Sequence, residues 1–346
     1  MANAYALACA AARAASRTAD AWPLFRSYRH FIRAKSPSQR PNNFGRLAKN
    51  NVFRYADASG RQRKYRYFGG IVLKIIFSRK GFDGTAGGCP SPIVDGRPLS
   101  LPIPTKMPSL TRYGDLSGPY GDLVTDLTRG RLTAENRCHL DPDVASECLP
   151  RIAGWRGALG QVSSAQGHLA KQNVGAGDLF IFWGLFRPVE HDGRWKFIGR
   201  PEHRIWGWLQ VGDVFDLGPD GSRAIQQHPW LELHPHVRPG WKSPNVLYLA
   251  ADRLRLGPKQ LPLRGWGTLK HGHRLSASNS LPSVWTVPDW LHPGKGGCGM
   301  TYNPSDRWKP EGSLQTAARG QEFVAHPTDS FSMSDWVTSV LMEAAS

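Results

Sequence analysis

The segment from Val174 to Leu217 constrains the fold of this 346-residue chain more than any other stretch. It contains three runs rich in aromatic and aliphatic residues, in the order LFIFWGLF, WKFIG and HRIWGWLQVGDVF. Such runs favour strands, and the Asp-Gly pair between the first two is typical of a hairpin turn. We therefore predict three neighbouring strands at the centre of an antiparallel or mixed sheet.

Further elements are predicted around this centre from shorter patterns. Apolar and alternating runs predict strands at 71–77, 245–251 and near 283–291, and a short edge strand followed by an extended connection within 93–104. Helical patterns predict short helices at the end of 111–127, after an Asp141 cap with Pro142 in the first turn, over 160–173, and over 332–345 with Ser334 as its cap. The predicted fold class is therefore α+β: a β-rich, mixed or antiparallel core that could close as a PUA-like barrel, with a few peripheral helices.

Positive charge is concentrated at the N-terminal end of the chain. Residues 1–70 contain 14 Lys and Arg and 2 acidic residues, a net charge of +12, whereas the other 276 residues contain 30 and 25, a net charge of +5. We interpret residues 1–71 as a basic, disordered leader that resembles a transit peptide or an upstream segment translated from a mis-assigned start, and residues 72–346 as a single domain. Bulk charge does not by itself establish a nucleic-acid interface on that domain.

Cysteine usage and hydropathy bear on the compartment. The five cysteines are odd in number and form no C-x-x-C pair, which argues against a zinc framework or a disulfide scaffold and favours reduced thiols in the cytoplasm. No apolar run approaches the roughly 18 residues that span a bilayer, so no membrane partner is expected. G-x-S-x-G, Walker, Rossmann and H-E-x-x-H motifs are absent from the sequence, which sets those enzyme families aside.

A charged, glycine-rich loop follows the strand predicted at 71–77. An Arg guanidinium forks onto phosphate oxygens, and glycines let backbone N–H groups approach a phosphate. The predicted nucleotide-binding residues of this loop are Ser78, Arg79, Lys80, Gly87 and Gly88. Asp83 is the candidate catalytic residue, as a base or a metal ligand; the alternative is a surface loop in which Arg79 and Asp83 pair. Cys89 in the same loop is a weaker candidate nucleophile.

Three residues outside this loop complete the predicted site. Gln161 and His168 could present amide and imidazole groups to a base edge, although a polar helix face explains them equally well. Trp183 could stack on a base, although most of the thirteen tryptophans must belong to the core. We expect Arg79, Asp83, Gln161 and His168 to converge on one cleft.

Two histidine-containing patterns bear on a possible metal site. His139, Asp141 and Asp143 alternate and would face one way on a strand, but the helix-cap interpretation accounts for both carboxylates without a metal. The pair His234 and His236 lies in a Pro-containing loop and lacks the spacing of zinc ligands. No cofactor is therefore predicted, and a divalent metal ion is kept as the weaker alternative.

Several separated motifs carry a family resemblance over residues 73–341. These are KIIFSRKGFDGTAGGCPSPI, CHLDPDV, VGAGDLFIFWGLF, IWGWLQVGDVF and ARGQEFV. Together they resemble the third type of nucleotide modification associated domain, a family found near genes for DNA base modification. The resemblance implies DNA or a modified nucleotide as a partner, together with other DNA-modification proteins, but supplies no reaction. The leading hypothesis is recognition of a modified nucleotide or base in DNA. The alternatives are an enzyme that cleaves or processes modified DNA through Asp83, and a scaffold of a modification complex.

Overall fold

The computed structural model describes residues 52–56, 62–66, 73–105, 109–218, 221–318, 320 and 322–343. Within them the chain is a mixed α+β protein built on a ten-stranded sheet and four α-helices, so the predicted fold class is confirmed. The prediction for residues 1–71 lies outside the described residues except for two strands. These are β1 (Val52–Ala56) and β2 (Gln62–Arg66), which pair with each other antiparallel.

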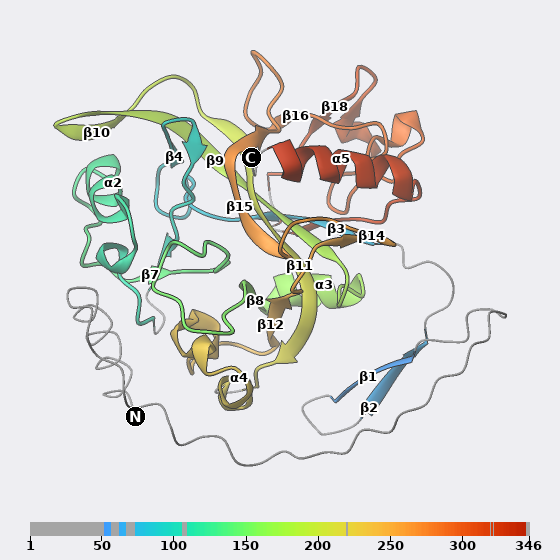
Figure 1. Cartoon of the computed structure of the whole chain (residues 1–346). Coiled ribbons are helices and arrows are strands. Elements are labelled where there is room, and N and C mark those ends of the chain that lie inside the picture. The colour runs from blue at the N-terminus through green and yellow to red at the C-terminus, as the bar shows by residue number, and fades with distance from the viewer. Residues whose placement is uncertain are drawn as a thin grey trace. The chain divides into compact units, whose positions relative to one another are not determined.

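Six strands form the main path of the sheet, in the spatial order β19-β3-β9-β11-β12-β8. Only β3 and β9 are parallel along this path; the other neighbours are antiparallel. Figure 1 shows the long central strands β9 and β11 crossing the core. The six strands are β19 (Glu322–Ala325), β3 (Ile75–Arg79), β9 (Leu179–Asp192), β11 (Glu202–Asp216), β12 (Asn245–Ala250) and β8 (Ala158–Val162).

Shorter strands extend this sheet or form small sheets beside it. Strands β10 (Arg194–Phe197) and β4 (Ser91–Val94) pair with β9, β5 (Arg97–Pro98) pairs with β4, and β15 (Trp266–Arg274) pairs with β11. The remaining strands are β6 (Ile103–Pro104) with β7 (Cys138–His139), β13 (Arg255–Leu256) with β14 (Lys259–Gln260), and β16 (Val284–Thr286) with β18 (Ser313–Gln315) and β17 (Trp308–Lys309).

The strands predicted from residues 174–217 are confirmed. Asp192 pairs with Arg194 across Gly193, whose φ of +66° is the left-handed value that the Asp-Gly turn requires. The predicted helices are confirmed at α2 (Tyr120–Leu127) and α5 (Ser330–Glu343). Asp329, and not Ser334, caps α5, because its carboxylate accepts hydrogen bonds from the backbone N–H groups of residues 331 and 332.

Two helix predictions are corrected. No helix follows Asp141, where the described chain runs irregularly from β7 to β8. Residues 158–162 form strand β8, so Gln161 lies on a strand, and α3 (Ser163–Lys171) begins only after it. Helix α4 (Ser222–Gln227) is an addition that the sequence patterns did not predict. None of the helices in the described part of the chain is long and apolar enough to cross a membrane.

Alternation along the central strands β3, β9 and β11 sorts their apolar side chains into two of the core clusters, one on each face of the sheet. On β3, Ile76 belongs to the inner cluster, which includes Phe180, Phe182 and Tyr248. Its neighbours Ile75 and Phe77 belong to the outer cluster, which α5 covers with apolar residues that include Val337 and Leu341. Each large apolar side chain buried in this way stabilises the fold by about 1.5–3 kcal/mol.

The main sheet curls until its two edge strands meet through side chains. β8 and β19 stand at opposite ends of the six-strand path, yet the side-chain amide of Gln161 on β8 donates a hydrogen bond to Glu322 on β19. No backbone pairing joins these two strands in the part of the chain that the structure describes. The sheet is therefore curled and open, and it does not form the closed PUA-like barrel in which the predicted core could have ended.

Candidate functional site

Strand alternation separates two residues that sequence analysis placed in one binding loop. Lys80 lies two residues after Ser78 and shares its inner face, whereas Arg79 lies on the outer face. There the Arg79 guanidinium pairs with Asp83 at 2.8 Å and lies 5.7 Å from the centre of the Trp183 ring. Trp183 itself is 1% exposed and packs in the outer cluster, so it offers no ring face to a base in this conformation.

Asp83 has the contacts of a residue that holds a turn together. Its Oδ1 accepts hydrogen bonds from the backbone N–H groups of Thr85 and Ala86 at 2.7 and 2.8 Å, and its Oδ2 pairs with Arg79. Burial acts to raise the pKa of Asp83, but these hydrogen bonds and the Arg79 charge outweigh it, and the pKa lies below its ordinary value. A general base works best with a pKa near the working pH, so these contacts give no support to a catalytic Asp83.

The glycines of the same loop are required by packing. A Cβ at Gly87 would overlap the Phe82 ring, and one at Gly88 would meet the guanidinium of Arg131, which donates a hydrogen bond to the Gly87 carbonyl at 2.7 Å. Burial raises the pKa of the Cys89 thiol to about 11. Because a thiol is nucleophilic as its thiolate, Cys89 is a poor nucleophile at neutral pH.

His168 lies in a different set of contacts from Gln161. Its Nε2 is 3.1 Å from Oγ1 of Thr301, and its ring packs against Tyr302 with the ring centres 4.6 Å apart. The expectation that Arg79, Asp83, Gln161 and His168 converge on one cleft is therefore corrected. The structure distributes them over three sets of contacts and keeps Ser78, Lys80 and Gln161 together.

The residues that do converge surround the carboxylate of Glu322, on the inner face where the two edges of the sheet meet. Oε1 of Glu322 accepts hydrogen bonds from Ser78 Oγ at 3.0 Å, from Lys80 Nζ at 3.3 Å and from the side-chain amide of Gln161. Oε2 is buried and has no partner among the described residues. We call Ser78, Lys80, Gln161 and Glu322 the polar centre.

Burial determines the protonation behaviour of Glu322. Its side chain is 1% exposed, and this burial raises the pKa of the carboxyl group above its ordinary value. The charge of Lys80 and the hydrogen bonds from Ser78 and Lys80 oppose the rise without cancelling it. A carboxyl group of this kind can hold a proton at a higher pH than a carboxylate in water.

A second group of buried polar side chains consists of three histidines and one aspartate, and we call it the histidine–aspartate cluster. Its members are His139 on β7, Asp141 in the following loop, and His234 and His236 at a short 3₁₀ turn, 235–237. Nε2 of His139 and Nε2 of His236 lie 3.8 and 3.7 Å from Asp141 Oδ2, and Nε2 of His234 lies 3.4 Å from Oδ1.

Neighbouring residues hold this cluster in place. The backbone N–H of Gly160 on β8 donates to Asp141 Oδ1 at 2.6 Å, and the absence of a side chain at Gly160 leaves room for the His236 ring. Trp241 stacks face to face on His236, with the ring centres 4.5 Å apart, and its Nε1 donates to the Pro235 carbonyl at 2.9 Å. Hydrogen bonds and ring stacking thus hold the cluster in a defined arrangement that is largely desolvated.

The cluster residues have strongly shifted pKa values. Burial lowers the pKa of His139 to about 3 and that of His236 to about 4, so both imidazoles are neutral at pH 7. Burial acts to raise the pKa of Asp141, but the close approach of His234 Nε2 at 3.4 Å and the positive charge around it outweigh burial and hold the pKa well below its usual range. At neutral pH Asp141 is therefore a carboxylate beside two neutral imidazoles.

The polar centre and the histidine–aspartate cluster are within electrostatic reach of each other. The Lys80 charge lowers the pKa values of His139, Asp141 and His236, and the Asp141 charge raises that of Glu322. We call the two groups together the inner site.

The inner site lies within a domain that matches a known protein family. The sequence matches the family described as Nucleotide modification associated domain 3 over residues 74–326. The chain belongs to this family. The matched range includes every residue of the inner site. Neither curated proteins nor solved structures provide a significant match.

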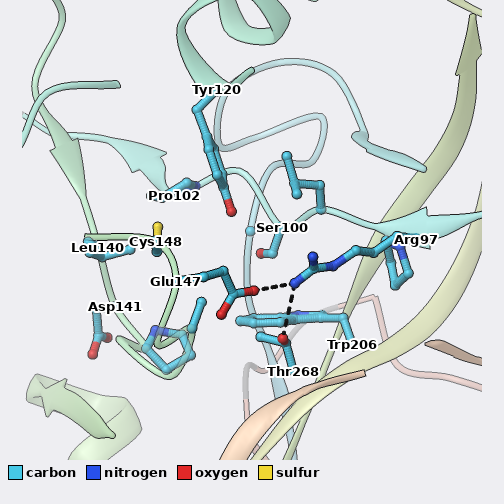
Figure 2. A pocket seen from close by; sticks show the side chains of 15 residues that line it. Arg97, Ser100, Pro102, Tyr120, Leu140, Asp141, Glu147, Cys148, Trp206 and Thr268 are labelled. Carbon is cyan, nitrogen blue, oxygen red and sulfur yellow. Dashed lines mark hydrogen bonds and ion pairs between the residues drawn. The ribbon is translucent and has the colours of Figure 1, made fainter. Parts of the chain in front are cut away.

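A surface pocket in the family domain approaches the inner site through Asp141. Figure 2 shows the pocket, in which Arg97 pairs with Glu147 and lies 3.5 Å from the Thr268 hydroxyl. Tyr120 and Trp206 also line it. Asp141 therefore lies between a pocket that opens to the surface and the buried imidazoles.

Sequence reasoning missed several residues of the inner site. Glu322 lies in the ARGQEFV motif that carries the family resemblance, but a single Glu before a short apolar run is common on any strand and does not mark a site residue. The His234 and His236 pair suggests a metal site, but the surrounding stretch of sequence contains no further ligands at the spacing of a zinc site. The missing partners, His139 and Asp141, are supplied about a hundred residues earlier in the chain.

Proposed function

We propose that this chain recognises a modified nucleotide or base of DNA, and that recognition takes place at the inner site. Family membership places the chain in the context of nucleotide modification. The observation that carries the proposal is the meeting of an ammonium group and a side-chain amide at the Glu322 carboxylate, with two neutral imidazoles close enough for the Lys80 charge to lower their pKa values. These groups suit the phosphate and the base edge of a nucleotide.

Lys80 and Gln161 have the leading roles in this proposal. The Lys80 ammonium has three donors, of which Glu322 accepts one, so it can also donate to a phosphate oxygen. The amide of Gln161 is held in one orientation by Glu322, and a fixed amide can read donors and acceptors on a base. Ser78 supports both residues through its own hydrogen bond to Glu322.

A second candidate function is an enzyme that cleaves or processes modified DNA at the same site. It is favoured by Glu322, a buried carboxyl group whose pKa burial raises above its ordinary value, as suits a general acid or base. Asp141, whose pKa lies well below its usual range, stays ionised in this candidate and stabilises developing positive charge. Glu322 thus takes the catalytic role that sequence analysis assigned to Asp83.

An incubation of the purified full-length protein with DNA tests both functions. The substrates are DNA with natural hypermodified bases and plain DNA of the same sequence, with and without Mg²⁺ or Mn²⁺. Binding is measured by fluorescence anisotropy, strand cleavage by gel electrophoresis, and altered bases by mass spectrometry of the nucleosides. Tighter binding to modified DNA with no chemical change supports recognition, whereas cleavage or an altered base mass supports the enzyme.

Variants connect either outcome to the inner site. Gln161→Leu is expected to weaken the preference for modified DNA about tenfold, because one good amide contact to a base contributes about 1–3 kcal/mol. Glu322→Gln keeps the shape of the carboxyl group and is expected to abolish any reaction. His326→Ala is the control, since His326 bonds Gln172 at the surface, outside the inner site. Equal behaviour of modified and plain DNA would contradict both functions and leave a scaffold of other DNA-modification proteins in the cytoplasm.

A further inference from the structure

We propose that His139, Asp141 and His236 bind a divalent transition-metal ion. The three side chains offer Nε2, a carboxylate oxygen and Nε2, and these atoms all lie within 4.8 Å of one another. The inference goes beyond the proposed function, because a bound metal ion could position a nucleotide or activate water equally well. It rests on four features of the cluster.

The first feature is the spacing of the donor atoms. Asp141 Oδ2 lies 3.8 Å from His139 Nε2 and 3.7 Å from His236 Nε2. Ligands about 2.0–2.2 Å from a tetrahedral zinc ion lie roughly 3.3–3.6 Å from one another. The two Asp141 contacts therefore need to close by only a few tenths of an ångström, and the two histidine nitrogens, which lie within 4.8 Å of each other, by at most about 1–1.5 Å.

The second feature is the tautomer of His236. The Asn245 side-chain amide donates to the His236 carbonyl at 2.9 Å, so its oxygen faces Nδ1 of the same histidine, also at 2.9 Å. That oxygen is an acceptor, so Nδ1 must carry the proton and Nε2 must carry the lone pair. Ligating histidines usually donate their other ring N–H in this way, and here the lone pair faces a carboxylate oxygen, so two acceptors lie side by side as they do around a bound cation.

The third feature is the orientation of Asp141. His234 Nδ1 accepts the backbone N–H of His236 at 3.3 Å, so the proton of the His234 ring is on Nε2, 3.4 Å from Asp141 Oδ1. Gly160 N–H donates to the same oxygen. The Gly160 hydrogen bond thus holds Oδ1, with His234 Nε2 beside it, and leaves Oδ2 to face the two imidazoles, where it accepts no hydrogen bond from the described residues.

The fourth feature is the charge of the site. The Asp141 side chain is 4% exposed, and the Lys80 ammonium, whose charge acts on Asp141, is paired with Glu322. Buried charges in proteins are normally paired with an opposite charge or coordinated to a metal ion. A divalent cation between Oδ2 and the two imidazoles supplies the missing positive charge.

The ligand types decide the class of metal. Two imidazoles and one carboxylate suit Zn²⁺, Co²⁺, Fe²⁺ or Mn²⁺, whereas Mg²⁺ and Ca²⁺ prefer sites made only of oxygen atoms. Three protein ligands leave at least one coordination position for water or for an atom of the nucleotide. This is the arrangement of a metal ion that takes part in binding or reaction, and not of a closed structural site.

Titration with Co²⁺ tests the inference on the untagged full-length protein after removal of metals with EDTA. Co²⁺ in a site of this kind gives visible d–d absorption, and Zn²⁺ should displace it at one equivalent per chain. Zn²⁺ at 100 times its Kd is expected to raise the Tm by roughly 5 °C, whereas Mg²⁺ at the same concentration should change neither signal. Absence of saturable Co²⁺ binding in the folded protein would overturn the inference.

Variants locate the ion. His236→Ala and Asp141→Asn should weaken Co²⁺ binding at least 100-fold, and Asn245→Ala should weaken it about 10- to 100-fold through the orientation of His236. His326→Ala removes a surface imidazole and should leave the Kd unchanged. Circular dichroism of the metal-free proteins establishes that each variant folds; if His236→Ala does not, Asp141→Asn and Asn245→Ala carry the test. A folded Asp141→Asn with the wild-type Kd refutes the site, whatever the DNA measurements show.

Discussion

Neighbouring residues on one strand can have unrelated roles, as Arg79 and Lys80 show. Arg79 pairs with Asp83 on the outer face, and Lys80 pairs with Glu322 on the inner face. Adjacent positions in the sequence suggested a single phosphate-binding loop, but the two-residue period of a strand assigns them to opposite sides of the sheet. Only Lys80 belongs to the inner site.

The Arg79 and Asp83 pair predicts a pH-dependent contribution to stability. Asp83→Asn keeps the turn acceptor and removes the charge, so it should lower the free energy of unfolding at pH 7 by about 1–2 kcal/mol. Because the folded-state pKa of Asp83 lies below its ordinary value, this contribution is present above that value and is lost as the pH falls through the folded-state pKa. Urea unfolding of both proteins from about pH 7 to about pH 3 measures the difference.

The exposed pair of Asp192 and Lys196 is the control for this measurement. Its carboxylate is 86% exposed, so Asp192→Asn should change the stability by less than about 1 kcal/mol at any pH. A difference between wild type and Asp83→Asn that stays constant through acidic pH would show that the charge pair is not its source.

The short strand β8 connects the two halves of the inner site. The Gln161 side chain takes part in the polar centre. The backbone N–H of Gly160 donates a hydrogen bond to Asp141, and the absence of a side chain at Gly160 leaves room for the His236 ring. Misplacing the helix boundary by a few residues, as the sequence patterns did, hides this role. On a helix Gly160 and Gln161 would not have presented these groups to two different partners.

Gly160→Ala should disrupt the histidine–aspartate cluster and leave the fold intact. A Cβ at this position would overlap the His236 ring, so the ring must move away from Asp141. We expect Co²⁺ binding to weaken by at least tenfold, with a loss of stability of about 1–3 kcal/mol from overpacking.

Gly167→Ala is the matched control. Gly167 lies in α3, and a Cβ added there would meet no atom within 4 Å. Alanine at this position should therefore stabilise the helix by up to about 1 kcal/mol and leave metal binding unchanged. The measurements are Co²⁺ titration and thermal unfolding of both variants. Unaltered metal binding in Gly160→Ala would show that His236 does not need its present position.

Across the whole molecule, the curl of the sheet creates the polar centre. Gln161 and Glu322 are 161 residues apart in sequence and occupy strands at opposite ends of the main path, yet their side chains bond directly. Lys80 and Glu322, 242 residues apart, are joined by the pairing of β3 with β19. The beginning and the end of the family domain therefore meet at one carboxylate.

The buried pair of Lys80 and Glu322 should contribute to the stability of this closure. Lys80→Met or Glu322→Gln alone leaves a buried charge or carboxyl group without its partner and should lower the free energy of unfolding by about 3–5 kcal/mol. The double variant should lose less than the sum of the two, by about 0.5–3 kcal/mol. Urea unfolding of the four proteins measures this coupling.

The same cycle on the exposed pair gives the reference. Lys196→Met and Asp192→Asn should show a coupling below about 1 kcal/mol, because water screens that pair. Strictly additive effects at Lys80 and Glu322 would mean that the two groups do not depend on each other.

The sequence by itself determined the local elements with strong periodic patterns. These are the strands within residues 174–217, the strand at β3, the strand at β12 and the closing helix α5, and each depends on neighbours that lie close in sequence. The same patterns placed three members of the polar centre, Ser78, Lys80 and Gln161, among the candidate residues. The family resemblance also followed from local motifs, and the match over residues 74–326 confirms it.

Only the tertiary structure decided which of these residues act together. The face that a side chain takes, the partner Glu322 from the end of the domain, and the meeting of His139 and Asp141 with His236 all depend on contacts between distant segments. The reason is physical: a propensity or a periodicity describes a residue and its neighbours in the chain, whereas a buried charge is stabilised by whatever the curled sheet brings to it.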